Sequence, residues 1–198
     1  DIPALGTTHA DDFYGPIPIP TLEDLKNPLD EVIEPRATQE EMTNFIETEL
    51  TESLKGLPTR TTQFGRFDKG LAYTILMKYY MHEKNWAKAE ECGRELLKAE
   101  YGYGLMDRYA DIFTLENEGN KEIIFACTEE RGTNLQLWHD HALPGNYPTK
   151  NASIQKWDGY KVPWPFYRTF EEGDDRLSVL VGEYVGTDGV LFNEESDI

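Results

Sequence analysis

The feature that most constrains the fold is a pair of helical segments joined by a very short turn. Residues 67–83 carry apolar side chains at helical spacing on more than one face, which predicts a helix buried between neighbours. The turn HEKN follows, and Asn85 is placed to cap a further helix over about 86–99. Because so few residues join them, the two helices must lie antiparallel. The chain is therefore expected to fold around a helical hairpin.

A third helix is expected before this hairpin, over about 38–56. Thr38 stands three residues before Glu41, the spacing of a capping box, in which a hydroxyl and a carboxylate satisfy free amide groups. Gly56 and Pro58 end the pattern. Apolar residues recur on one face between these limits, at Met42, Phe45, Ile46, Leu50 and Leu54.

The hairpin also resembles a tetratricopeptide-type (TPR) repeat. Such repeats place aromatic and leucine residues on the first helix, and an aromatic three residues before a small alanine on the second. Met77 and Gly93 depart from the pattern, since they stand where the repeat has glycine and an aromatic residue. A regular array of such repeats is therefore not expected. The matching residues are Tyr73, Leu76, Tyr80, Trp86 and Ala89.

The rest of the chain shows less regular structure. Residues 1–36 are punctuated by proline, as in GPIPIP, which predicts an extended arm with one turn at LEDL. One short turn of helix is expected to end at Phe113, and KEIIFAC reads as a short strand. Beyond Thr128 we expect mainly loops, with a short helix around 164–171. The sequence therefore predicts a mainly α protein with little β structure.

The composition excludes some classes of partner. With 37 acidic and 19 basic residues the formal net charge is −18, which disfavours nucleic acids and anionic lipid surfaces. A neutral ligand, a cation or a basic partner stays open. No run approaches the ~18 apolar residues of a membrane helix.

The two cysteines, Cys92 and Cys127, both read as small buried hydrophobic residues, and their spacing requires no disulfide. The chain starts at DIPALG and ends at NEESDI, and we expect it to be a piece of a longer protein. An export signal or lipid anchor would then lie upstream.

A set of motifs in a fixed order, across residues 15–176, resembles the SusD/RagB family of outer-membrane glycan-binding lipoproteins. The chain corresponds to a central portion of such proteins. The motifs are Gly65-Arg66 opening an aromatic helix, Trp86-Ala87-Lys88-Ala89, Tyr109 through Phe113, Asn120 with Glu122-Ile123-Ile124-Phe125, Trp157-Asp158-Gly159-Tyr160, and Phe170-Glu171 with Gly173-Asp174 and Arg176.

This resemblance implies a scaffold of TPR-like helical hairpins with a glycan site built on loops. Within one SusD-like domain fragment, residues 1–127 would form the scaffold with its proline-rich arm, and residues 128–198 the loop-rich ligand-binding segment. It also implies a non-catalytic protein of the outer-membrane surface that delivers oligosaccharides to a SusC-like TonB-dependent transporter. Its only membrane attachment would be an N-terminal lipid anchor, which this chain lacks. No cofactor is implied.

The candidate binding surface is aromatic. Sugar rings stack their C–H faces on Trp and Tyr, while amides and carboxylates bind the hydroxyl groups. Any one of these aromatic residues could equally fill the core under a loop, and we expect one or two to face solvent. The glycan-binding candidates are Trp138, Trp157, Tyr160, Trp164, Tyr147 and Asn146, and the wider polar and aromatic set adds Asn134, Gln136, Asn151, Gln155, Asp158 and Tyr167.

Metal and catalytic sites are expected to be absent. His139 and His141 could face one side of an extended loop, but no third ligand is near in sequence. The acidic cluster at 171–175 offers oxygen atoms of the kind that calcium takes, without the spacing of a calcium loop. We expect a polar loop and a solvated turn, with Arg176 paired to a nearby carboxylate.

Two alternatives to glycan binding stay open, and a third, glycoside hydrolysis, is disfavoured. A peptide-binding member of the same family would use the same scaffold. A TPR-like adaptor would bind a partner protein through polar residues that line the hairpin. A glycoside hydrolase needs two carboxylates about 5–10 Å apart, and the sequence shows no motif that places such a pair.

Overall fold

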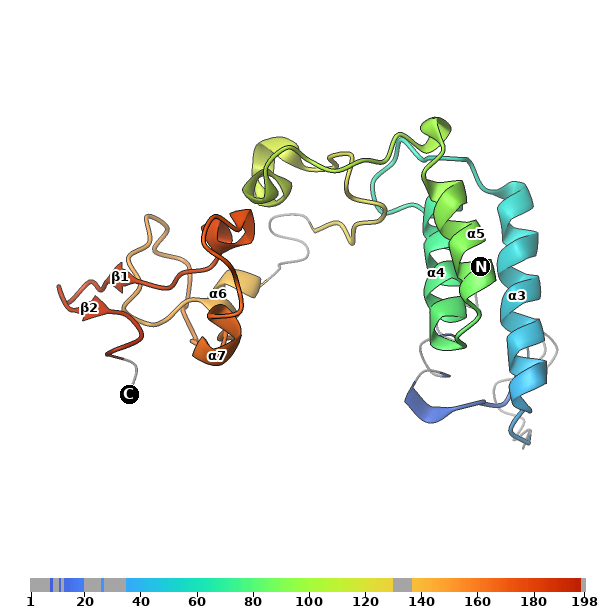
Figure 1. Cartoon of the computed structure of the whole chain (residues 1–198), viewed down its shortest axis with the longest axis horizontal. Coiled ribbons are helices and arrows are strands. Elements are labelled where there is room, and N and C mark those ends of the chain that lie inside the picture. The colour runs from blue at the N-terminus through green and yellow to red at the C-terminus, as the bar shows by residue number, and fades with distance from the viewer. Residues whose placement is uncertain are drawn as a thin grey trace. The chain divides into compact units, whose positions relative to one another are not determined.

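The computed structural model of the chain describes Thr8, Asp11, residues 13–19, Lys26, residues 35–129 and residues 137–196. Its contacts divide the chain into two compact units (Figure 1). The first comprises Asp1–Gly104 with Lys121–Cys127, and the second comprises Leu105–Asn120 with Thr128–Ile198. The sequence boundary after residue 127 differs from this division, because 105–120 are assigned to the second unit.

Helix α3 spans Gln39–Gly56 and begins with the expected capping box. The Thr38 hydroxyl oxygen accepts the Glu41 amide proton at 3.2 Å, and the Glu41 carboxylate accepts the Thr38 amide proton at 2.8 Å. The arm before it has no regular secondary structure at residues 17–19, and the Ala37 amide donates to the Ile17 carbonyl at 3.3 Å. The expected turn at LEDL lies outside the described residues.

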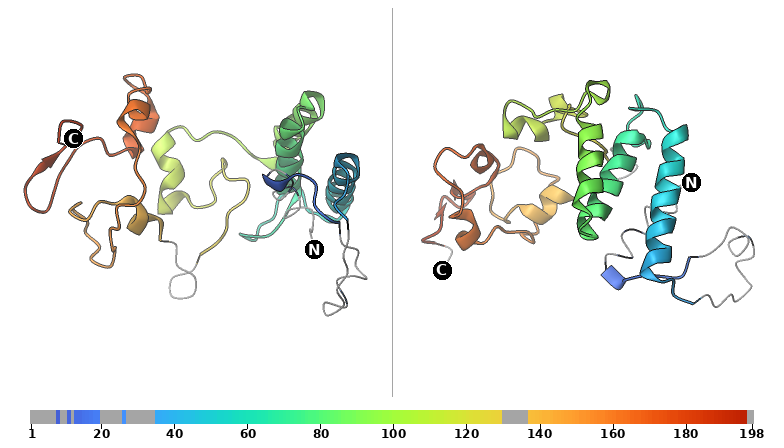
Figure 2. Two further views of the ribbon diagram at one scale, coloured as in Figure 1. Left: turned by 90° about the horizontal axis from the view of Figure 1, so that it is seen from below. Right: turned by 45° about the vertical axis from the view of Figure 1, so that its right-hand side comes forward.

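Helices α4 (Lys69–His82) and α5 (Trp86–Leu96) form the expected antiparallel hairpin, and α3 lies beside it (Figures 1 and 2). The Asp68 carboxylate caps α4 by accepting the Leu71 amide proton at 3.0 Å. The Asn85 side chain caps α5 through the Lys88 amide. None of the described helices is long and apolar enough to cross a membrane.

The core of the first unit lies between these three helices. Tyr79 of α4 is almost fully buried, and its hydroxyl group is 2.9 Å from the Thr43 hydroxyl of α3. Cys92 is buried as expected. The mainly α, TPR-like fold predicted from the sequence is confirmed. The core residues are Met42, Ile46, Leu50, Leu76, Tyr79, Tyr80, Ala89 and Cys92.

The predicted strand at KEIIFAC is wrong. No strand is formed over 121–127, because one backbone bond, from the Gly104 amide to the Lys121 carbonyl, does not make a ladder. The apolar character of this segment serves side-chain packing, since the Phe125 ring lies 5.7 Å from that of Phe67. Cys127 is exposed at the end of the segment, so the expectation that it is buried is also wrong.

The second unit is built from short elements. They are 3-10 helices at Tyr109–Phe113, Leu115–Asn117 and Asp175–Val179, α6 (Trp138–Ala142), α7 (Trp164–Tyr167), and strands β1 (Tyr184–Val185) and β2 (Leu191–Phe192). The strands pair antiparallel, with Tyr184 opposite Phe192. The helix expected around 164–171 ends at Tyr167, where the chain passes into turns.

Candidate functional site

Four aromatic side chains of the second unit form a cluster, which we call the aromatic platform. Trp138 and Tyr160 stack with ring centroids 5.1 Å apart and planes 21° from parallel. The His141 ring lies 5.2 Å from that of Tyr160 and 4.8 Å, edge-on, from that of Trp157. His141 therefore joins Trp157 to the stacked pair.

The platform is half open to solvent. Trp138 is 55% exposed, Trp157 49% and Tyr160 53%. Rings in a core would be covered, so these three offer aromatic surface to a ligand while their remaining surface packs on one another. Three of the six sequence candidates are thus brought together, and His141 joins them.

Local geometry explains how these residues meet. Trp138 and His141 are three residues apart on α6, so they lie on the same face one turn apart. The loop that carries Trp157 and Tyr160 returns to this helix, where the Gly159 and Tyr160 amides both donate to the His141 carbonyl at 2.6 and 2.9 Å. The spacing of three residues between Trp138 and His141 is the sequence signal that could have added His141 to the binding candidates.

Trp157 lies on a tightly constrained piece of backbone. Its neighbours Lys156 and Asp158 have φ angles of 57° and 56°, a left-handed conformation that non-glycine residues rarely adopt. Such conformations persist only where surrounding contacts enforce them, and they cluster at functional sites. The Lys156 ammonium donates to the Tyr147 carbonyl at 3.1 Å, which is one of these contacts.

Asn146 and Tyr147 lie against the β hairpin. The Tyr184 hydroxyl donates to the Asn146 side-chain oxygen at 2.8 Å, and the Tyr147 ring lies 5.0 Å from that of Tyr184. The Asn146 carbonyl accepts the Thr187 amide proton. The Asn146 side-chain oxygen therefore already has a structural partner, and its amide group is the part left to consider for a ligand.

The remaining candidates lie in varied surroundings. Trp164 is half-buried and packs edge-on against Tyr167 at 5.4 Å. Asn151 accepts the Ser153 amide and hydroxyl protons within a turn, and Asp158 pairs with Lys161 at 3.1 Å. The candidates Asn134 and Gln136 fall outside the described residues.

The metal hypotheses gain no support. His139 and His141 lie on α6 rather than in an extended loop, and two residues along a helix separate side chains by more than half a turn. Asp174 forms an ion pair with Arg176 at 2.5 Å, and these contacts hold the pKa of Asp174 at about 2. Over the part of the chain that the structure describes, no three metal-ligating side chains come together.

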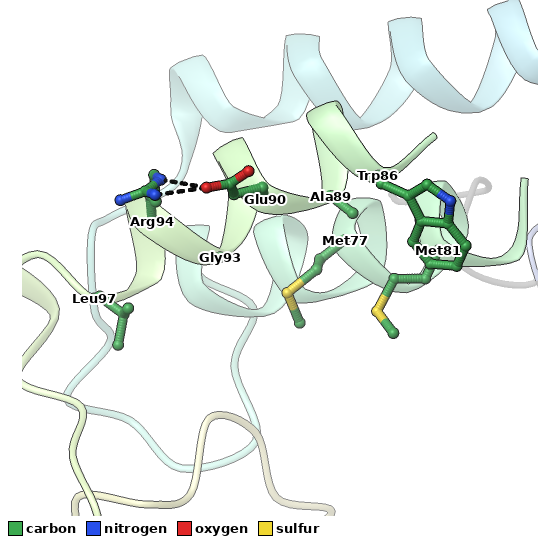
Figure 3. Close-up of a pocket in the computed structure, with 8 residues that line it drawn as sticks. All are labelled: Met77, Met81, Trp86, Ala89, Glu90, Gly93, Arg94 and Leu97. Carbon is green, nitrogen blue, oxygen red and sulfur yellow. Dashed lines mark hydrogen bonds and ion pairs between the residues drawn. The ribbon is translucent and has the colours of Figure 1, made fainter. Parts of the chain in front are cut away.

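A second surface feature is an apolar groove on the helical hairpin, with a volume of about 490 Å³. Met77 and Met81 of α4 and Trp86 and Leu97 at α5 line it (Figure 3). Trp86 is 62% exposed and Leu97 82%. The Glu90–Arg94 ion pair is its charged part. Sequence reasoning placed Trp86 in the repeat pattern but did not identify this groove.

Comparison with known proteins finds matches among solved structures, while no family model and no curated protein matches. A SusD-like protein from Bacteroides fragilis NCTC 9343 is 26% identical, with a TM-score of 0.54 over 64% of this chain and 25% of its own. Surface glycan-binding protein A from Bacteroides uniformis is 19% identical, with a TM-score of 0.72, and the match covers 96% of this chain and 42% of that protein. A protein whose structure was solved with xylogluco-oligosaccharide is 22% identical, with a TM-score of 0.58, and the match covers 73% of this chain and 32% of that protein. The chain thus spans less than half the length of each protein.

Proposed function

Because this chain has the fold of the SusD-like proteins, we propose that it binds neutral oligosaccharides at the cell surface without catalysing a reaction. The aromatic platform is the observation that carries the proposal. Its rings present flat apolar faces to solvent, the surface on which the C–H groups of a sugar stack.

The surroundings of the platform suit a sugar. Asp158 and Lys161 lie beside Trp157 and Tyr160 and carry groups that can accept from and donate to hydroxyls. A net charge of −18 favours neutral glycans over polyanionic ones, because like charges repel. The candidates Asn146, Tyr147 and Trp164 are proposed as extensions of the site.

The remaining parts of the proposal concern the whole protein. We propose that it is anchored in the outer membrane by an N-terminal lipid and passes its glycan to a SusC-like TonB-dependent transporter. The support is the likeness of fold to SusD-like proteins. In the three matches above, this chain covers 25–42% of the length of the matched protein. A peptide ligand on the same platform is the alternative within this family.

The adaptor hypothesis gains less support. It requires polar residues along the exposed side of the hairpin, whereas Met77, Met81, Trp86 and Leu97 make that side mainly apolar. No hydrolase pair is proposed, since the platform rests on aromatic stacking rather than on two facing carboxylates.

The test is a calorimetric titration of the full-length protein with xylogluco-, malto-, cello- and manno-oligosaccharides, and with a panel of peptides. We expect saturable binding of one sugar class. Trp138→Ala and Trp157→Ala should each raise Kd about fivefold or more, because one stacked ring is worth about 1 kcal/mol. Trp164→Ala and Asn146→Ala show whether the site extends toward α7 and the hairpin.

The matched control is Trp86→Ala, which removes a tryptophan that is at least as exposed from the apolar groove of the other unit. It should leave sugar affinity unchanged. Binding of peptides alone would favour the peptide-binding alternative. If no sugar binds, the proposal is overturned. If a sugar binds with the same Kd to the wild type and to the Trp138 and Trp157 variants, the platform is not its binding site.

A further inference from the structure

Asp140 is a buried charged residue on the helix that carries two rings of the aromatic platform. It lies in the middle of α6 and is 8% exposed, while Trp138, Trp157 and Tyr160 are about half exposed. Among the described residues, the other buried carboxylates, Asp11 and Asp68, belong to the first unit. A carboxylate is costly to bury unless it accepts hydrogen bonds, so its partners identify its role.

Both the side chain and the backbone of Asp140 bind the loop that carries Trp157. The carboxylate accepts the Gln155 amide proton, and the Asp140 carbonyl accepts the Trp157 amide proton at 2.5 Å. The Asp158 amide donates to the Leu143 carbonyl at 3.1 Å. Together with the two bonds to the His141 carbonyl, these contacts fasten residues 155–160 to α6 and its end. Of these acceptors only the Asp140 carboxylate is a side chain.

These bonds oppose the preference of the backbone. Lys156 and Asp158, on either side of Trp157, both hold left-handed φ angles. Without enforcing contacts a non-glycine residue leaves this region. Loss of the bond at Gln155 would remove one of the contacts that enforce the Lys156 conformation, and the Trp157 ring would then be less firmly held at the edge of His141.

We propose that Asp140 is a positioning residue that holds the platform in its binding geometry before the ligand arrives. This inference rests on the proposed function, since it assigns a role within that site. Asp140 itself is covered by the loop, and it acts through Trp157 and Tyr160. A surface that is already ordered binds more tightly, because the cost of ordering those side chains is removed from association.

The chain offers a conservative variant that separates positioning from charge. In Asp140→Asn the side-chain oxygen still accepts the Gln155 amide proton, whereas Asp140→Ala leaves that proton without its acceptor. Glu172→Ala is the matched control, because it removes one exposed carboxylate of the same unit.

The experiment measures two quantities on the full-length protein and these three variants. Hydrogen exchange follows the amides of 155–160, and calorimetry gives Kd for the four oligosaccharides named above. We expect Asp140→Ala to speed exchange at 155–160 and to raise Kd about tenfold. The Kd of Asp140→Asn should stay within about threefold of that of the wild type. Glu172→Ala should match the wild type in both exchange rate and Kd.

The outcomes separate the inference from the proposed function. If the wild type binds no sugar, the proposed function is overturned and the role in ligand binding falls with it. If the wild type binds and Asp140→Ala binds equally well, the inference alone is overturned. It is also overturned if Asp140→Asn loses both exchange protection and affinity as fully as Asp140→Ala, since the charge rather than the accepted bond would then be responsible.

Discussion

Replacing Gly70 by alanine should destabilise the helical unit, although the same change normally stabilises a helix. Gly70 lies in the first turn of α4 and is buried. A Cβ atom built there would stand 2.8 Å from Cζ of Tyr103 and closer still to its hydroxyl oxygen. That oxygen is buried and has no hydrogen-bond partner, so the ring is held by its ring contacts rather than by its hydroxyl group.

The magnitude follows from what the Tyr103 ring would lose by moving. It stacks on Tyr101 with centroids 6.0 Å apart, a pair worth about 0.5–1.5 kcal/mol. The Arg60 guanidinium lies 4.9 Å from its centroid, which adds about 0.5–1 kcal/mol. Overpacking itself costs about 1–3 kcal/mol, and the helix gains about 1 kcal/mol from alanine. The net loss should be about 1–4.5 kcal/mol, with a fall in Tm of about 2–4 °C for each kcal/mol.

Thermal unfolding followed by far-UV circular dichroism measures this effect. Gly93→Ala is the matched control, because a Cβ there meets only the Met77 sulfur at an ordinary 3.5 Å, and it should raise Tm by about 2–4 °C. In a Tyr103→Ala background, Gly70→Ala should change sign and stabilise. A higher Tm for Gly70→Ala alone would refute the reasoning, since the ring would then have moved at no cost.

Two further predictions concern pH. Burial raises the pKa of Tyr79 to about 12, so the stability that its neutral form contributes is present below about pH 10 and lost as the pH rises through about 12. The Tm measured over this pH range should therefore fall less steeply in Tyr79→Phe than in the wild type, and equal slopes would contradict the assignment. Hydrogen bonds from the Thr38 amide and hydroxyl lower the pKa of Glu41 below its ordinary 4.5, so its contribution is present above that value and lost as the pH falls through the lowered pKa. Glu41→Gln should therefore show a weaker acid dependence of unfolding, with Glu40→Gln, an exposed neighbour, as its control.

The helices could be predicted because their signals are local. Side-chain spacing marks the face that is buried, and caps such as Thr38 with Glu41 mark where a helix begins. The strand at 121–127 could not be judged in this way, because a strand depends on a partner elsewhere in the chain. The β hairpin carried a usable signal in Asp188-Gly189, where Gly189 has a φ angle of 79°.

The site was predictable only as a set of residue types. Trp138 and Trp164 look alike in sequence, yet one is 55% exposed in a stack and the other is half-buried against Tyr167. That difference arises from how the loops return to α6, which no local pattern encodes. The sequence predicts only a polar loop at Asp140, because the role of this residue depends on amides 15 or more residues away.

The bonds that shape the platform have a consequence for which parts of the chain can vary independently. Trp138, His141, Trp157 and Tyr160 lie in one short stretch of chain, and the bonds that hold them are made within that stretch. The helical core at 39–96 supplies none of these rings. The stretch from 138 to 160 therefore carries its own local framework, and substitutions within it can change the shape of the platform without altering the helical core.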